Sequence, residues 1–173
     1  MKRGCLIILA LLMGGCGEKS LFVLPKEPIA PIKKSYKKVG IKEIKLPNYL
    51  NDDKIEIIKS DGSIEYLKGY WADEPKNIFT NRLINNLREL LKNPNIKEYP
   101  WGFDNKENLT IVRVEISDIY YKDGFLYIKG IYDIDGKSRF FNIREKCEKN
   151  GQSLVKALAK GIDRISQMIA TII

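Results

Sequence analysis

The sequence predicts an α+β fold in which two main helices pack on one face of an antiparallel or mixed sheet. Residues 110–144 alternate apolar and polar side chains and are interrupted at Asp123-Gly124 and Asp135-Gly136, which is the pattern of a three-stranded antiparallel meander. Two other segments, 75–91 and 152–172, carry apolar residues at helical spacing. With 173 residues, the chain is long enough for one domain that buries its own core.

Shorter strands precede the first helix. Alternating side chains predict a strand over 39–46, with a change of phase near Glu43. Residues 54–60 and 63–67 are two further strands, and Asp61-Gly62 between them is a hairpin signal.

The helices have recognisable ends and faces. The first begins at Pro75, behind two acidic residues that suit a helix N-terminus, and ends before Asn93-Pro94. A short extended piece, 96–101, follows it. The last helix has an apolar stripe interrupted by charged residues, so we expect it to lie on the sheet and not in a membrane. Its small residues would permit close approach either to a second subunit or to the sheet; they are Ala157, Ala159, Gly161 and Ala170.

The first 16 residues have the pattern of an export signal. Lys2 and Arg3 precede an unbroken apolar run from Leu6 to Met13, and small residues follow the run. The run is far shorter than the roughly 20 residues of a membrane-spanning helix, which excludes a transmembrane interpretation.

A cysteine stands at the expected cleavage site. Met13-Gly14-Gly15-Cys16 resembles the bacterial lipobox, in which the thiol is acylated and cleavage leaves it as the first residue. The alternative is an ordinary signal peptide with a coincidental cysteine. On the lipobox interpretation, residues 1–15 are a lipoprotein signal peptide, 16–20 a lipidated tether and 21–173 the folded domain. Several acyl chains, palmitate among them, would anchor Cys16 firmly, because one chain alone binds only marginally.

The residues after the cysteine bear on location and on the start of the domain. Gly17 takes the place of the Asp that resembles an inner-membrane retention signal, which favours the periplasmic leaflet of the outer membrane. Residues 21–24 are apolar and are either a strand of the domain, which we prefer, or part of a tether that continues through the proline-spaced segment 25–38.

Composition argues against an enzyme. The chain has no histidine, which is the commonest metal ligand and the usual acid-base group near pH 7, so zinc hydrolases and histidine-dependent triads are excluded. Cys147 lacks a histidine partner and is expected to be a tolerated free thiol. Asp52-Asp53 and Asp73-Glu74 lie at turn or cap positions, where acids make local hydrogen bonds. We therefore expect no catalytic residue, no metal and no cofactor other than the lipid on Cys16.

Positive charge is concentrated in one segment. The net charge is +8, and six lysines between Pro31 and Pro47 are opposed only by Glu43. For an exported protein the anionic partners are phospholipid headgroups or an acidic protein face, since nucleic acid is in another compartment. A solvated lysine-rich surface explains the same residues.

Four large aromatic residues lie at the ends of predicted elements. They are candidate partner-docking residues, because aromatic side chains at such positions can anchor an interface. Packing at the edge of the domain explains the same positions. These residues are Tyr49, Trp71, Tyr99 and Trp101.

An ordered set of motifs resembles the auxiliary lipoproteins of ABC transporters, the PqiC-like group. Besides the lipobox, Val39-Gly40 through Leu46-Pro47-Asn48-Tyr49-Leu50 is similar to that family's "VG…V.LP.YL" segment. Trp71 to Pro75 is similar to its "WAEP" motif with one residue more, and Tyr99-Pro100-Trp101 to its "YPW". The first apolar segment and the last helix complete a match over nearly the whole chain.

This resemblance implies a non-enzymatic envelope component. It would work with an MCE-domain protein and an ABC permease system in moving lipid between membranes, as a docking and tethering adaptor. A ring-forming homo-oligomer is its candidate assembly, and another subunit would handle ATP. The alternative from a different class is a stand-alone envelope assembly or structural lipoprotein. An envelope hydrolase fits poorly, because no nucleophile and base can be paired.

Overall fold

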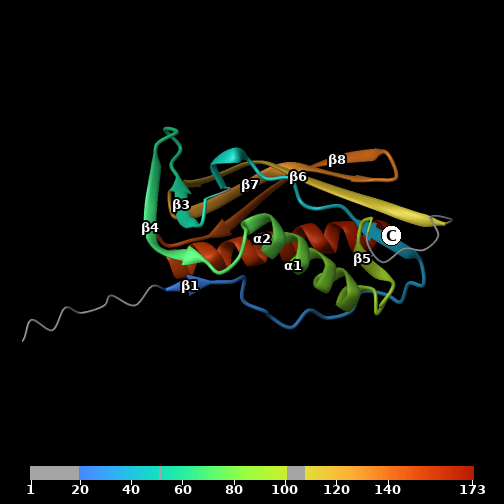
Figure 1. Ribbon diagram of the computed structural model, residues 1–173. Coiled ribbons are helices and arrows are strands. Elements are labelled where there is room, and N and C mark those ends of the chain that lie inside the picture. Colours follow the sequence, from blue (N-terminus) through green and yellow to red (C-terminus); the bar gives the residue numbers. More distant parts are fainter. Residues whose placement is uncertain (1–19, 51, 101–107) are drawn as a thin grey trace, which may run out of the picture.

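The computed structural model describes residues 20–50, 52–100 and 108–173. These residues form two mixed sheets and two helices (Figure 1). The smaller sheet has the order β1 (Leu21–Phe22), β4 (Ile64–Trp71), β3 (Lys54–Ile58). The larger has the order β5 (Ile96–Glu98), β2 (Lys38–Ile41), β6 (Leu109–Lys122), β7 (Phe125–Ile134), β8 (Lys137–Lys146). The helices are η1 (Asn48–Leu50, a 3₁₀ turn), α1 (Pro75–Leu90) and α2 (Gly151–Ile172).

The α+β class and the meander are confirmed. Strands β6, β7 and β8 pair antiparallel through both Asp-Gly turns, with one irregularity in β6 where the register against β7 shifts between Ile116 and Asp118. Asp123 and Asp135 have φ of 50° and 51°, and each following glycine also has a positive φ, as a two-residue hairpin turn with the right twist requires. Gly130 is needed for packing, because a Cβ there would lie 2.1 Å from the carbonyl oxygen of Glu115.

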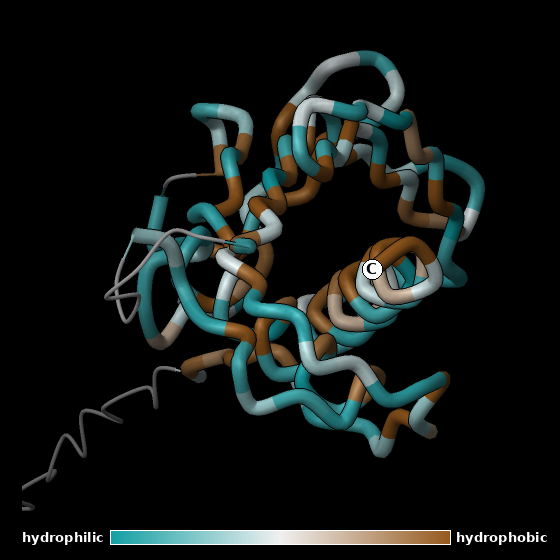
Figure 2. The backbone as a smooth tube through the Cα atoms, turned by 90° about the vertical axis from the view of Figure 1, so that its right-hand side faces the viewer, coloured by the Kyte–Doolittle hydropathy of each residue, from teal (hydrophilic) through white to brown (hydrophobic). Residues whose placement is uncertain are grey.

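The two helices contact the larger sheet through different strands. α2 packs directly on β7 and β8, and the larger sheet curves around it (Figure 2), whereas α1 packs mainly against α2 and β5. Gly161 explains the close approach of α2, because a Cβ there would meet Ile128 of β7 at 2.2 Å. The small residues of α2 are therefore used inside the domain, against the sheet.

Several predicted segments have altered bounds; β4, predicted over 63–67, continues to Trp71. Residues 39–46 do not form one strand: β2 ends at Ile41, and Lys45 rejoins β6 through a single bridge to Glu115, so the chain bends where the alternation changes phase. Leu21 and Phe22 form β1, parallel to Tyr70 and Trp71 of β4, so the apolar start belongs to the domain.

The core lies between the sheets and the helices and draws on every large element. Fully buried side chains include Ile41 of β2, Ile55 of β3, Leu83 of α1, Leu126 of β7 and Ile162 of α2. None of the described helices has the length and apolar character that crossing a bilayer requires.

Candidate docking site

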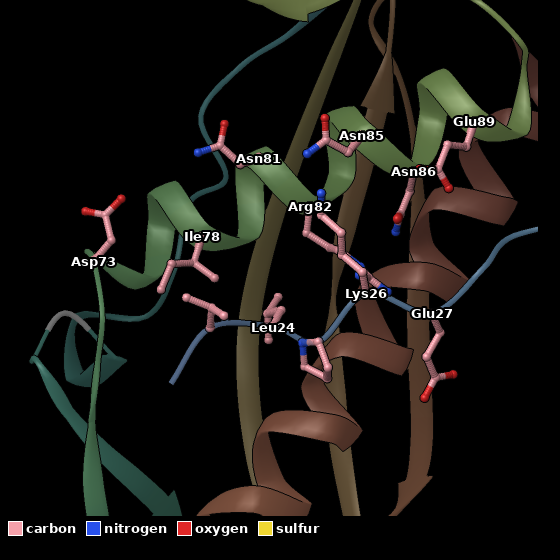
Figure 3. A pocket seen from close by; sticks show the side chains of 12 residues that line it. Leu24, Lys26, Glu27, Asp73, Ile78, Asn81, Arg82, Asn85, Asn86 and Glu89 are labelled. Carbon is pink, nitrogen blue, oxygen red and sulfur yellow. The ribbon is translucent and has the colours of Figure 1, made fainter. Parts of the chain in front are cut away.

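A groove runs between α1 and the chain segment that follows β1. Its volume is about 470 Å³. Val23, Leu24 and Pro25 form one wall with Ile78 of α1, and this wall is apolar. Figure 3 shows the segment passing along the helix, with Ile78 turned toward Leu24. The groove is thus built by residues far apart in sequence, which are brought together by the pairing of β1 with β4 and by hydrogen bonds from Ile32 and Ser35 to the end of α1.

The opposite wall is polar and belongs to α1. It presents the amides of Asn81 and Asn85 and the carboxylate of Glu89, and Asp73 lies just before the helix. With Glu27 from the facing segment, three carboxylates line the groove; the cations among the lining residues are Lys26 and Arg82.

Arg82 is not free to bind an anion, because it is paired behind the groove. Its Nε and Nη2 donate to the two carboxylate oxygens of Asp163 on α2, each at 2.9 Å. Asn86 donates to Asp163 at 2.7 Å and to the Ser166 hydroxyl at 3.1 Å. With Arg82 neutralised by this α1–α2 clasp (Arg82, Asn86, Asp163 and Ser166), the groove itself carries a net negative charge.

The groove therefore offers features that recognise a polypeptide segment. Its apolar wall can bury aliphatic side chains, its amides can pair with a main chain, and its carboxylates favour lysine or arginine on the occupant. Within the described ranges, no group of three or more His, Cys, Asp or Glu side chains is placed to hold a metal ion.

Tyr49 and Trp71, two of the sequence-predicted docking residues, are engaged inside the domain. The Tyr49 hydroxyl donates to Asp118 at 3.3 Å and accepts from the Ile119 N–H at 3.1 Å, close to the irregularity in β6. Burial raises the pKa of Tyr49. Trp71 is buried and packs edge-on against Phe79 of α1, with ring centroids 5.9 Å apart. The contacts of Tyr49 and Trp71 are therefore packing contacts within the domain.

Tyr99 and Trp101 stand apart from the groove. Tyr99 is half-buried after β5, and a Cβ at Gly40 would stand only 3.2 Å from its ring. The Lys42 ammonium lies 5.7 Å from the centre of that ring. Trp101, like Cys16, lies outside the described residues. The four aromatic candidates do not form one cluster.

The lysine-rich segment lies at the end of the molecule remote from β1. Its backbone is held to the end of α1, where Ile32 and Ser35 donate to Leu90 and Leu91. Figure 1 shows β1 at one end and β5 with the C-terminus at the other. Of the six lysines, Lys45 pairs with Glu115 at 2.9 Å, whereas Lys33, Lys34, Lys37 and Lys38 are exposed around Tyr36.

Sequence reasoning missed the α1–α2 clasp. The signal was present, because Arg82 and Asn86 are polar residues four apart on a helix side that is otherwise apolar, and Asp163 interrupts the stripe of the last helix. Nothing in one sequence pairs the two helices, so the partner of each residue could not be inferred.

The described geometry is that of an α+β domain with a binding groove. The family model described as "ABC-type transport auxiliary lipoprotein component" matches residues 22–170, and the chain belongs to this family. This confirms the resemblance drawn from the motifs. Membership makes the protein an auxiliary component of an ABC-type transport system and a lipoprotein of the cell envelope.

Solved structures share the fold. A crystal structure of an uncharacterised protein superposes with a TM-score of 0.68 at 23% identity, covering 88% of this chain and 97% of the other. Protein XCC0632 from Xanthomonas campestris gives a TM-score of 0.67 at 7% identity, covering 87% and 92%. A comparison with curated protein sequences finds no significant match. At these identities the structures support the fold alone.

Proposed function

We propose that the protein is a lipid-anchored docking adaptor of an ABC and MCE intermembrane lipid transport system. Cys16 carries the acyl anchor, residues 1–15 are removed, and the domain is held at the periplasmic leaflet of the outer membrane. The groove beside α1 then receives a segment of the MCE-domain partner. The protein performs no reaction itself; it binds and confines.

The groove is the observation that carries this proposal. Its volume of about 470 Å³ lies within the range of ligand-binding clefts, and its walls combine an apolar strip with amides and carboxylates. A partner segment with aliphatic and basic side chains complements these walls. Membership in an auxiliary family of ABC-type transport supports an association with a transport partner.

Because the domain is tethered to the membrane, a weak contact in the groove is sufficient to hold the partner. A short anchor confines the domain near the partner and raises the effective concentration to about the millimolar range. Tyr99 and Trp101, which lie after β5, remain proposed as a second contact of the same partner.

The test is co-purification from the envelope after crosslinking, probed for the MCE-domain protein. The variant Glu27→Lys/Glu89→Lys reverses two groove carboxylates and should reduce recovery at least tenfold. The control, Glu148→Lys, reverses an exposed carboxylate between β8 and α2 that lies neither in the groove nor beside Tyr99, and it should leave recovery unchanged. Equal recovery with both would exclude the groove, and no MCE-domain protein in any sample would favour a stand-alone structural lipoprotein.

A further inference from the structure

Three large hydrophobic side chains are exposed on the outer side of the smaller sheet. Leu21 of β1 is 65% exposed, and Tyr66 and Ile64 of β4 are 58% and 46% exposed. The pairing of β3 with β4 shifts register between Tyr66 and Tyr70. Leu21 and Lys54 both pair with Tyr70, and the Lys54 ammonium lies over the Tyr66 ring, which places Leu21 on the same side of the sheet as Tyr66. We call Leu21, Ile64 and Tyr66, with the exposed Lys54 and Lys68, the β4 face.

The lysines of this face are placed beside its apolar residues. Lys54 pairs with Tyr70 across β3 and β4, and its ammonium lies 5.0 Å from the centre of the Tyr66 ring. A tyrosine with an adjacent lysine is typical of the membrane–water interface, where the ring occupies the headgroup level and the ammonium reaches water. Asp52 and Asp53 precede Lys54, so the face has no strong net charge.

The short stretch of chain between Cys16 and β1 limits how far the β4 face can lie from the membrane. The Ser20 carbonyl accepts a hydrogen bond from the Tyr70 N–H at 2.9 Å, so the chain is fixed to β4 from Ser20 onward. Four residue steps separate Ser20 from Cys16, and they span at most about 14 Å. An acyl chain on Cys16 therefore holds Ser20, and with it the start of β1 and the Tyr70 end of β4, within that distance of the lipid surface. The exposed lysines of residues 33–38 are at the other end of the molecule.

We propose that the β4 face rests on the membrane that holds the Cys16 anchor, with Leu21 and Tyr66 at the boundary between headgroups and acyl chains. This rests on the acylation of Cys16 assumed in the proposed function. The contact is mainly apolar, so it requires no anionic lipid. It fixes which side of the domain faces the membrane and turns the lysine-rich end away from it.

The test uses the acylated protein in phosphatidylethanolamine vesicles that contain headgroup-labelled nitroxide lipid. With Cys147→Ser as background, a fluorophore is attached at Tyr66→Cys or, as the matched control, at Phe140→Cys. Phe140 is 92% exposed on β8 of the other sheet. We expect quenching at position 66 at least threefold stronger than at position 140, with little change when salt is raised.

Several outcomes would overturn the proposal. Quenching at position 66 no stronger than at position 140 would mean that the β4 face does not rest on the membrane. Quenching at position 66 that depends on protein density would indicate that a second copy of the protein covers the β4 face. A third label at Ile64→Cys guards against a local defect at position 66 and should behave like it. The assay contains no partner protein, so its result does not depend on whether an MCE-domain protein co-purifies. Protein that does not stay on the vesicles would exclude both the acyl anchor and this proposal.

Discussion

Glu56 is an acidic residue among the buried isoleucines of β3. It is 8% exposed, and its Oε2 has no hydrogen-bond partner among the described residues. Burial raises the pKa of Glu56, and the nearby Asp52 charge adds to the effect. A carboxyl whose folded pKa is raised stabilises the fold fully at pH values below its unfolded pKa, and this contribution is lost as pH rises through the folded pKa.

Glu56→Gln should therefore stabilise the protein at neutral pH and not in acid. We expect a gain of about 1 kcal/mol at pH 7, at the low end of the cost of an unsatisfied buried polar group, because the new amide is also buried. Urea unfolding at pH 7 and at pH 4 measures the difference. An equal gain at both pH values would show that ionisation of Glu56 is not the cause.

The burial of Cys147 is not evident from its neighbours in the sequence. It stands among charged residues, yet it is 2% exposed, its sulfur lies 3.2 Å from the Glu148 carbonyl oxygen, and its N–H donates to Gly124. Burial raises the pKa of the Cys147 thiol, which keeps it in the unreactive form. Cys147, which the sequence predicts to be a free thiol, is therefore a core residue, and its backbone N–H binds the turn between β6 and β7.

At the scale of elements, the α1–α2 clasp decides how the helices dock. Arg82 and Asp163 form a bidentate pair with side chains 5% and 14% exposed, and Asn86 and Ser166 complete it. A buried pair contributes modestly when intact, but removal of one partner leaves a buried charge without compensation.

Asp163→Ala should cost about 3 kcal/mol of the free energy of unfolding, near the lower end of the range for a broken buried pair, because water retains some access to Asp163. Urea unfolding measures this. The double variant Arg82→Met/Asp163→Ala should recover much of the loss, and the exposed Lys160→Ala on α2 should change stability by less than about 0.5 kcal/mol. A double variant no better than the single one would contradict the pairing.

Element boundaries were predicted best where local chemistry dictates them. Pro75 begins α1, the two Asp-Gly turns separate β6, β7 and β8, and α2 begins one residue before the predicted start, behind Asn150, whose side chain accepts from the Ser153 N–H at 2.8 Å. The bend after Ile41 was only hinted at, since its cause is a single long-range bridge from Lys45 to Glu115.

At the scale of the whole molecule, the proposed function makes membrane retention depend on the acylated sulfur of Cys16. Cys16→Ala should leave the protein unprocessed or mislocalised, and at least tenfold more of it should be released from the membrane fraction by carbonate washing, because the domain's described helices cannot span a bilayer. Fractionation and intact mass measure this. Retention of the variant after washing would exclude the acyl anchor.

The sequence by itself determined the α+β class, the family and the expected anchor, because periodicity, Asp-Gly turns and the motif around Cys16 are local signals. Only the tertiary structure decided that Trp71 and Cys147 are buried, that Arg82 meets Asp163, and that a groove exists between α1 and residues 23–27. It also placed Leu21 beside β4 and the exposed lysines of residues 33–38 at the far end. Each of these joins segments distant in the chain, and strand pairing and packing, not local propensity, bring such segments together.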